Sequence, residues 1–215
     1  MKNRQRYYWL YAVLFFYIAG TLQAQNQPDA ATTALVVIDV QNDYFPGGKM
    51  TLNGADEAAA NTALLLQKFR SEKRTIIHIQ HIGPETAPFL ATGTVGAELY
   101  HKVAPLPGEK VITKQYPNSF RETALLAYLK EKHITHLVIA GMMTDVCVDA
   151  TVRAAKDFDL NTIVIGDACA TKERTLYGKV IPAHQIHTAY LAGLTAVGNL
   201  YAEVWQTKDY LSRSK

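Results

Sequence analysis

Three reactive side chains stand where apolar, strand-like runs of the sequence end. Asp39 lies late in the run ALVVIDV, Lys114 closes the run VITK, and Cys147 follows shortly after the run HLVIA. In an open parallel sheet the carboxyl ends of the strands meet at one edge, and functional sites form there. A carboxylate and an ammonium group beside a thiol could activate the sulfur as a nucleophile for attack on a carbonyl carbon.

Each of the three residues also has a purely structural explanation. Lys114 could be a surface lysine, and Cys147 could be a small core residue. Asp39 could hold the loop over residues 41–44 by accepting from backbone N–H groups. It differs from the other two, because a carboxylate within an apolar strand is buried and needs a compensating partner. A lysine and a cysteine that reach the same sheet edge supply such a partner, so we interpret the three side chains as one reactive group.

The segment GMMTDVCV, residues 141–148, predicts how the thiol is presented. Gly141 permits a sharp exit from the strand, and Thr144 fits an N-cap, which places Cys147 at the third position of a helix. There the sulfur would lie beside unpaired backbone N–H groups and the positive end of the helix dipole, so we expect a lowered thiol pKa. The same N–H groups could hold a developing oxyanion.

Alternating apolar runs and helical patterns predict the elements that position these residues. Nearly continuous apolar runs, typical of parallel strands covered on both faces, span 34–40, 75–80, 111–114, 136–140, 161–166 and 202–206. Helical patterns span 55–72, 119–132, 145–158 and 182–194. Ser119 and Glu122 have the spacing of a capping box at the start of the second helix. The order predicts an α/β, three-layer αβα open sheet of about six parallel strands, which is Rossmann-like.

Residues 1–24 have the pattern of a secretory signal peptide. Three basic side chains precede an uncharged, mostly apolar run over residues 7–19, and Ala24 precedes the expected cleavage point. The run is shorter than the roughly 20 apolar residues that span a bilayer, which makes an uncleaved membrane anchor the less favoured alternative. We therefore expect an exported, periplasmic protein.

The rest of the chain predicts a single domain over residues 34–215, after a polar linker over residues 25–33. Three of the 22 basic side chains and none of the 19 acidic ones lie in the signal segment, so the remainder carries no formal net charge. Nothing in this balance attracts nucleic acid, or a membrane surface after cleavage. The expected partners are a small-molecule substrate and further copies of the chain in a homo-oligomer.

Three segments resemble the signature segments of the isochorismatase-like cysteine hydrolases. They are DVQNDYFPGG over residues 39–48, Lys114 with NSF over residues 118–120, and GMMTDVCV over residues 141–148. They occur in the order that this superfamily shows, and the similarity covers about residues 34–207. The superfamily includes nicotinamidases, carbamoyl amide hydrolases and streptothricin-type hydrolases.

This resemblance implies an isochorismatase-type sheet with helices on both faces. It assigns a catalytic triad to Asp39, Lys114 and Cys147. It also implies a cis peptide bond between Met142 and Met143, which would help to aim the backbone N–H groups of Met143 and Cys147 as an oxyanion hole.

The histidine pattern argues against a metal site. Nicotinamidases that resemble this fold carry an Asp-x-His metal cluster, whereas this sequence has His78 and His81 without that spacing. Residues three apart in a strand point to opposite faces, so these two side chains cannot chelate one ion together. His184 and His187 could face one way on a helix but have no evident third ligand. With no phosphate-cradling loop either, we expect neither a metal nor another cofactor.

A substrate pocket is expected beside the triad segments, because such pockets are mostly apolar with a few placed polar groups. The apolar candidates are Phe45, Phe120 and Met142. The polar candidates are His81, Asn118 and Asp145. The long, proline-rich segment 82–110 is expected to act as a lid or a wall of the pocket.

These features together predict a cysteine-dependent hydrolase that cleaves an amide-type C–N bond of a small molecule through an acyl-thioester. One alternative is an ether or ester hydrolase of the same family. The other is a non-catalytic or redox-gated binding protein of the same fold, in which a Cys147–Cys169 disulfide would block the nucleophile. The absence of a Cys-x-x-Cys pattern disfavours the redox alternative.

Overall fold

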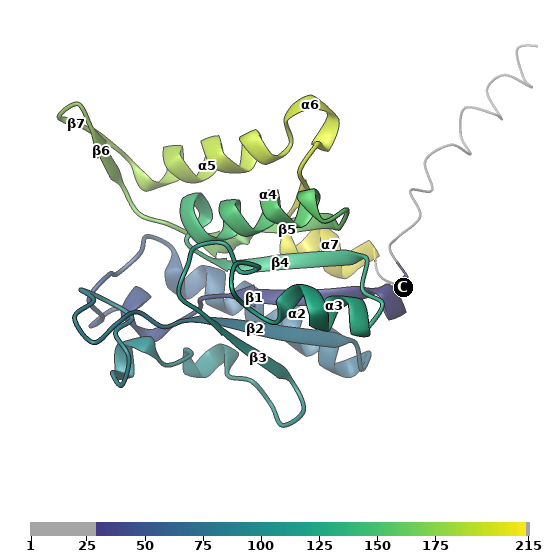
Figure 1. Cartoon of the computed structure of the whole chain (residues 1–215). Helices are drawn as coiled ribbons and strands as arrows, with labels where there is room; N and C mark the ends of the chain where they lie inside the picture. Colours follow the sequence, from purple (N-terminus) through teal and green to yellow (C-terminus); the bar gives the residue numbers. More distant parts are fainter. Residues whose placement is uncertain (1–28, 214–215) are drawn as a thin grey trace, which may run out of the picture.

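A parallel six-stranded sheet runs through the molecule, with helices on both of its faces (Figure 1). The structure, a computed structural model, describes residues 29–213. The strand order is β3-β2-β1-β4-β5-β8. The strands are β1 Thr33–Ile38, β2 Thr75–His81, β3 Lys110–Lys114, β4 His136–Met142, β5 Asn161–Ala170 and β8 Glu203–Trp205. All neighbouring pairs are parallel, which confirms the predicted fold class.

In the part of the chain that the structure describes, five helices make up the two outer layers. They are α2 Ala55–Ser71, α3 Leu125–Glu131, α4 Asp149–Asp157, α5 Ala183–Leu194 and α7 Thr207–Arg213. A short α6 Ala196–Asn199 follows α5, and a two-stranded antiparallel hairpin, β6 Arg174–Leu176 and β7 Lys179–Ile181, stands outside the main sheet. Short 3-10 turns occur at Ala30–Thr32, Asn42–Tyr44, Val95–Ala97 and His101–Val103.

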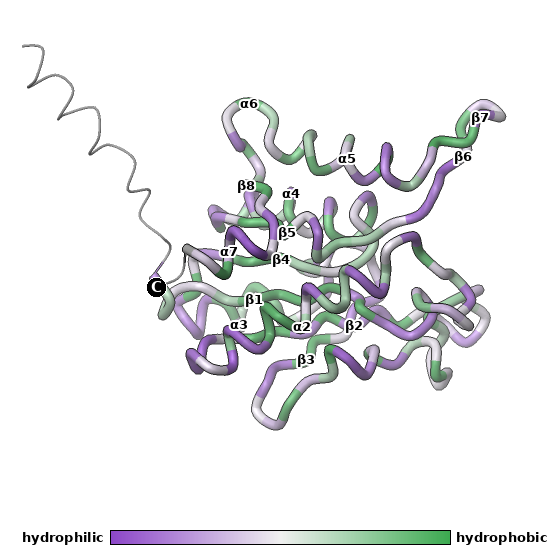
Figure 2. Tube along the Cα trace, turned by 180° about the vertical axis from the view of Figure 1, so that it is seen from behind, coloured by the Kyte–Doolittle hydropathy of each residue, from purple (hydrophilic) through white to green (hydrophobic). Residues whose placement is uncertain are grey.

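The central strand β1 shows how the sheet separates two apolar cores. Successive side chains of a strand point to opposite faces. Leu35 and Val37 pack in a core that includes side chains of α2 and α7, whereas Val36 and Ile38 pack in a second core with α3 and α4. Every residue of β1 is buried, which is why this strand is apolar almost without interruption. Figure 2 shows the same apolar centre from behind.

The helix predicted over residues 119–132 is shorter than expected. Helix α3 begins only at Leu125, so the predicted capping box is wrong. Ser119 is fully buried, and its hydroxyl lies 2.8 Å from Thr151 Oγ1 in α4. The Ser119 hydroxyl is used in this contact with α4, so it does not cap a helix. Glu122, the other residue of the predicted capping box, adopts a positive φ of 56°.

Two other elements also differ from the pattern-based prediction. The helix expected from residue 145 begins instead as a π-helical turn, Thr144–Val148, which leads into α4. Strand β5 continues to Ala170, four residues further than predicted, and its pairing with β4 shifts in register between Ile139 and Gly141. The extension places Cys169 inside the strand, opposite Gly141.

The predicted signal segment lies outside the described residues. Within residues 29–213, no helix combines the length and the apolar character that a bilayer span requires.

Candidate active site

The three reactive side chains meet at the carboxyl edge of the sheet. Asp39 directly follows β1, Lys114 ends β3, and Cys147 lies in the π-helical turn after β4. The Lys114 ammonium lies 2.6 Å from Asp39 Oδ2, and neither side chain is exposed to solvent. The Cys147 sulfur lies within 4.8 Å of a carboxylate oxygen of Asp39. The sheet therefore brings together the three residues that the sequence pattern singled out.

The backbone at Asp39 is unusual. Its φ of 51° lies in the left-handed region, which few residues other than glycine adopt. Its N–H donates to the carbonyl of Ile79 in β2 at 3.0 Å, so the neighbouring strand holds this conformation. Strained backbone of this kind persists where the surrounding structure fixes it, and it is common at functional sites.

The turn that carries the thiol depends on a glycine. Gly141 has a φ of +134°, and a Cβ atom at this position would collide with the backbone carbonyl of Ile38 in β1. No residue with a side chain fits there. The peptide bond between Met142 and Met143 is cis, as the family resemblance implied.

The N-cap prediction for this turn is wrong. Met143, and not Thr144, precedes the turn, and it offers no capping side chain. The Thr144 hydroxyl instead lies 2.9 Å from Nδ1 of His187 in α5. The Met143 carbonyl accepts from the amides of Val146 at 3.0 Å and Val148 at 3.2 Å. Helix α5 therefore holds the turn that presents Cys147, a contact that no local pattern could predict.

The pKa of the Cys147 thiol is raised, whereas the sequence predicted a lowered one. Burial is the main cause, and the negative charge of Asp39 acts in the same direction, while Lys114 opposes it. The resting site therefore holds a protonated thiol beside a carboxylate that can accept its proton.

At neutral pH the side chain of Lys114 is charged, whereas that of His81 is neutral. Burial disfavours the charge on Lys114, but the Asp39 carboxylate and the Cys147 sulfur raise the pKa of this lysine above its usual value. Burial and the Lys114 charge lower the pKa of His81. Lys114 Nζ lies 3.3 Å from His81 Nδ1. A charged lysine must donate there, so the proton of the neutral imidazole lies on Nε2.

Asp39, His81 and Cys147 offer the spacing of a metal site, with ligand atoms within 4.8 Å of one another. However, the Lys114 ammonium already lies against both Asp39 and His81. A divalent cation would be repelled by that charge. His78 points to the other side of its strand and contacts Glu109 at 2.9 Å, so the two histidines do not share a ligand site, as the spacing predicted.

The predicted pocket residues divide between the two faces of the sheet. Phe120 belongs to the same apolar core as Cys147, whereas Phe45 and Met142 pack in the core on the α2 side. The Phe45 ring stacks on Tyr100, with ring centroids 3.5 Å apart. The side chains of Phe45, Phe120 and Met142 are all buried.

The polar pocket candidates have protein partners of their own. The Asn118 side-chain oxygen accepts from the amide of Phe120 at 2.9 Å, which forms a local turn. Asp145 is bound by Arg174 at 2.7 and 3.0 Å and by the hydroxyl of Thr171. Because Asp145 lies two residues before the thiol, this ion pair holds the nucleophile turn from the hairpin side. His81 joins the reactive cluster itself.

Two residues that the sequence reasoning left without a role, Gln41 and Asp43, support this site. Gln41 binds both backbone groups of His81 at 2.8 Å and the carbonyl of residue 97 at 2.6 Å. Asp43 accepts from the amides of Lys49 at 3.0 Å and Leu90 at 2.6 Å, which ties the long segment 82–110 to the sheet edge. The sequence feature that could have identified Gln41 and Asp43 is their position in the segment DVQNDYFPGG.

Tyr44 from the same segment lies next to the reactive cluster. It is buried, and the pKa of its phenol is raised by burial and by the negative charge of Asp39. The phenol therefore stays protonated and can serve only as a neutral hydrogen-bonding group near the thiol.

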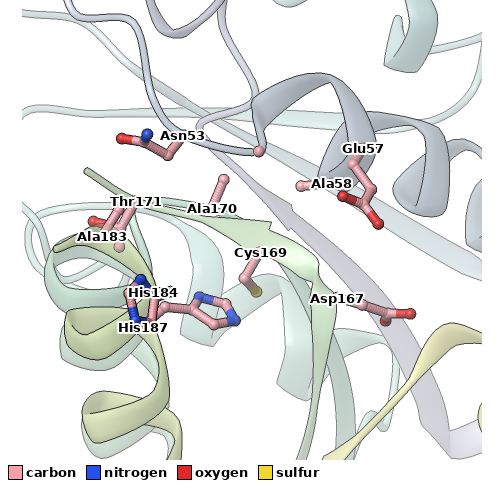
Figure 3. A pocket seen from close by; sticks show the side chains of 11 residues that line it. Asn53, Glu57, Ala58, Asp167, Cys169, Ala170, Thr171, Ala183, His184 and His187 are labelled. Atoms are coloured by element: carbon pink, nitrogen blue, oxygen red, sulfur yellow. The ribbon is translucent and has the colours of Figure 1, made fainter. Parts of the chain in front are cut away.

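A cavity of about 360 Å³ lies next to the nucleophile turn, at the end of β5. Figure 3 shows Cys169 and Ala170 between the histidines of α5 and the residues of α2. The lining includes His187, which contacts the nucleophile turn, and Cys169, but not Cys147. Both cysteines are free thiols among the described residues, so Cys169 is the competing thiol in any labelling experiment.

Fold and site together define an α/β protein with a dry carboxylate–ammonium–thiol cluster at the carboxyl edge of its sheet. A family model for the isochorismatase domain matches residues 33–196. The chain belongs to the isochorismatase family and is a hydrolase of that family.

Individual relatives agree with this assignment. The chain is 44% identical over 181 residues to the uncharacterized isochorismatase family protein YddQ of Bacillus subtilis, across 84% of this chain and 99% of that one. It is 30% identical to a nicotinamidase of Acinetobacter baylyi, across 65% of this chain and 82% of that one. A crystal structure of an isochorismatase from Pseudomonas putida KT2440 superposes with a TM-score of 0.80 at 33% identity, across 90% and 96% of the two chains.

Proposed function

We propose that the protein hydrolyses an amide-type C–N bond of a small molecule, with Cys147 as the nucleophile and an acyl-thioester as the intermediate. The observation that carries this proposal is the buried cluster in which the Lys114–Asp39 ion pair lies against the thiol. A core cysteine would not need a buried carboxylate and a buried ammonium as neighbours, because burying both charges is costly.

The first half of the reaction begins with a proton transfer. Asp39 accepts the Cys147 proton and becomes neutral, and Lys114 stabilises the negative charge of the resulting thiolate. The thiolate attacks the carbonyl carbon, and the backbone N–H groups of Met143 and Cys147 hold the oxyanion that forms. When the C–N bond breaks, Asp39 returns the proton to the leaving nitrogen, and the acyl group remains on sulfur.

The second half uses the same carboxylate. A water molecule attacks the thioester carbonyl while Asp39 takes a proton from it. The C–S bond then breaks, the carboxylic acid leaves, and the sulfur regains its proton from Asp39. The raised thiol pKa gives this carboxylate its importance, because few sulfur atoms are ionised without a base.

The relatives favour an amide over other scissile bonds. A nicotinamidase is among the proteins to which this chain is similar, and its name describes amide hydrolysis. An ether or ester bond is the second candidate, since family members named isochorismatase occur among the solved structures. We also propose that the reaction needs no metal, because the Lys114 ammonium supplies the positive charge beside Asp39 and His81.

We propose that the substrate binds among the six pocket candidates. Phe120 lies in the same core as the thiol, and His81 lies in the reactive cluster, so these two are expected to have the largest effects on KM. The remaining candidates are Phe45, Met142, Asn118 and Asp145. Kinetics of a Phe120→Ala variant test the apolar wall, and an unchanged KM for the preferred substrate would argue against it.

The deciding experiment combines a substrate panel with a labelling assay. Amides, carbamoyl compounds, lactams and esters are tested with release of ammonia, amine or acid as the readout. Cys147→Ala should abolish turnover, whereas Cys169→Ala should retain it. Mass spectrometry with an activated ester should show the acyl group on Cys147. Labelling of Cys169 alone, or full activity of Cys147→Ala, would contradict the proposal.

The same preparation distinguishes the redox-gated alternative. Both thiols are free in the structure, so we expect the purified protein to be active without reductant. Activity that appears only after dithiothreitol treatment would favour a protein gated by a Cys147–Cys169 disulfide.

A further inference from the structure

One hydrogen-bond donor of the reactive cluster has no acceptor in the protein. His81 ends β2 and is half-buried. Its Nδ1 accepts from the Lys114 ammonium at 3.3 Å, so the ring proton lies on Nε2. Within residues 29–213 this Nε2–H group donates to no protein atom, and it is not sealed from solvent, unlike the unpaired Nδ1 of His78. The His81 donor is therefore both free and accessible.

Two neighbours fix the position of this donor. The buried side chain of Gln41 accepts from the His81 amide and donates to the His81 carbonyl, both at 2.8 Å, which holds the backbone. Lys114 holds the ring at Nδ1, and Lys114 is itself held by Asp39 at 2.6 Å. The other tautomer of the ring would lose the hydrogen bond from Lys114. A donor that is fixed before the ligand arrives reduces the cost of ordering on binding.

The donor also lies close to the place where the reaction occurs. One ring nitrogen of His81 lies within 4.8 Å of the Cys147 sulfur, and the second nitrogen belongs to the same small ring. The sulfur bonds the carbonyl carbon of the substrate, and an N–H···O hydrogen bond joins atoms about 2.9–3.0 Å apart. The Nε2–H group can therefore reach a substrate atom that is one or two bonds away from the reacting carbon.

The scissile amide group does not need this donor. In the proposed reaction the amide oxygen is held by the backbone N–H groups of Met143 and Cys147, and the leaving nitrogen receives its proton from Asp39. An amide nitrogen does not accept a hydrogen bond, because only its carbonyl oxygen has that capacity. The acceptor for His81 is therefore a further oxygen or nitrogen atom of the substrate.

The charged side chains around the thiol are already paired. Asp39 lies 2.6 Å from Lys114, and Asp145 lies 2.7 Å from Arg174. The Cys147 thiol is protonated, because burial raises its pKa. An ionic group of the substrate in this buried part of the site would find no free counter-charge, and an unpaired buried charge is costly. The reacting end of the substrate is therefore expected to be uncharged.

We propose that His81 selects the substrate by donating from Nε2 to an oxygen or nitrogen atom that lies one or two bonds from the scissile carbonyl carbon of an uncharged amide. The proposal rests on the proposed function and adds the substrate class to it. Alkoxyacetamides and carbamates are members of this class. A simple alkyl amide leaves the donor unpaired once the bound substrate excludes water, which weakens its binding.

The test compares methoxyacetamide with butanamide, in which a methylene group replaces the ether oxygen. The wild type should prefer methoxyacetamide in kcat/KM by about tenfold or more. His81→Gln keeps an N–H donor and an acceptor for Lys114, so it should retain most of this preference, whereas His81→Met has no N–H donor and should lose it. His136→Met is the matched control, because His136 is also half-buried but lies where β4 begins, at the opposite edge of the sheet. It should keep the wild-type ratio.

The ratio of two substrates on one variant separates selection from a general loss of activity or folding, because such a loss lowers both rates. Malonamate, which carries a charge, should react more slowly than methoxyacetamide. A wild-type ratio near one, an unchanged ratio in His81→Met, or a preference for malonamate would overturn the proposal.

A binding measurement keeps this test separate from the test of the hydrolase. Each amide is assayed for protection of Cys147 against alkylation by iodoacetamide, which requires no turnover, and methoxyacetamide should protect at about tenfold lower concentration than butanamide. Equal protection by the two amides would overturn the role of His81. Failure of the hydrolase proposal would instead appear as undiminished turnover in Cys147→Ala, or as no turnover of any amide while the protection ratio persists.

Discussion

The ammonium group of Lys114 lies 2.6 Å from the carboxylate of Asp39, and neither side chain has solvent contact. The two residues come from β3 and the end of β1, which are separated in the sheet by β2. Two charges in a dry environment are costly unless each compensates the other. Their pairing makes the carboxylate available as a base beside a thiol that is otherwise protonated.

Removing one member of this pair should destabilise the fold. Asp39→Asn leaves the Lys114 charge buried without compensation, so we expect a loss of about 3–5 kcal/mol in the free energy of unfolding. The double variant Asp39→Asn with Lys114→Met should recover part of that loss, because no buried charge remains. Denaturant titration measures both effects.

An exposed ion pair provides the control for this experiment. Glu131 and Lys132 are exposed and 3.4 Å apart, and Glu131→Gln should cost about 1 kcal/mol or less. Equal losses for Asp39→Asn and Glu131→Gln would show that the buried pair has no special role in stability.

A second ion-pair network predicts how stability falls in acid. Partial burial opposes the charge of Glu109, but hydrogen bonds from Arg70, from the amide of Leu106 and from His78 lower the pKa of this carboxyl from 4.5 to about 2. A lowered folded-state pKa stabilises the fold above the unfolded value. That contribution is therefore present above pH 4.5 and is lost as the pH falls from 4.5 toward 2.

Glu109→Gln should consequently melt below the wild type at neutral pH, by about 2–4 °C for each kcal/mol lost in a domain of this size. The gap between the two proteins should narrow as the pH falls through this range. Thermal melts at several pH values measure it, with the exposed Glu85→Gln as a control. A gap that stays constant with pH would show that Glu109 does not titrate in this way.

The chelator experiment tests the role of Lys114 as the local positive charge. We expect EDTA to leave the rate unchanged, because the Lys114 ammonium lies where a cation would have to bind Asp39 and His81. Activity that disappears with EDTA and returns with zinc, iron or manganese would show that a metal displaces the lysine. Lys114→Met then serves as a comparison, since it should be inactive with or without metal.

The residues of the site were predictable from sequence because they end or follow apolar strands. Asp39 follows the continuously buried, apolar strand β1, and Lys114 ends the shorter edge strand β3, which has only two buried residues. The register of such strands brings their carboxyl ends together, so the cluster follows from the order of elements. Contacts from distant segments, such as His187 to Thr144 and Arg174 to Asp145, leave no local pattern.

The predictions of the Cys147 pKa and of the helix boundaries were wrong for related reasons. The sequence reasoning considered the helix N-terminus near Cys147, but the effect of burial depends on the whole packed core. The capping box of Ser119 matched by spacing, yet the hydroxyl bonds Thr151 across the interface with α4. In both cases tertiary packing overrides a local preference of about 1 kcal/mol.

The ion pair of Asp145 and Arg174 should position the nucleophile turn. Arg174→Ala leaves a carboxylate that is only 5% exposed without its cation, and the turn two residues from Cys147 should shift. We expect kcat to fall about tenfold to a hundredfold, as displacements near 1 Å can cause, with less change in KM. Arg174→Lys should restore part of kcat, and Lys172→Ala should have no effect. If Arg174→Lys loses as much kcat as Arg174→Ala, positioning of the turn requires the two hydrogen bonds that an arginine makes to Asp145. An unchanged kcat in Arg174→Ala would contradict the positioning role.

The N-terminal segment leads to a prediction about location. We propose that the protein is exported and that the mature chain begins at Gln25, because residues 1–24 combine a basic start, an apolar run and a small residue at the cleavage point. Expression of the full chain in a Gram-negative host should give periplasmic activity, and intact-mass measurement should show the loss of residues 1–24. Leu14→Arg places a charge in the apolar run and should retain the uncleaved chain inside the cell, whereas a Gln27→Arg control beyond the cleavage point should be exported normally. An uncleaved chain found in the membrane fraction would support an anchor, and an uncleaved soluble chain would contradict export.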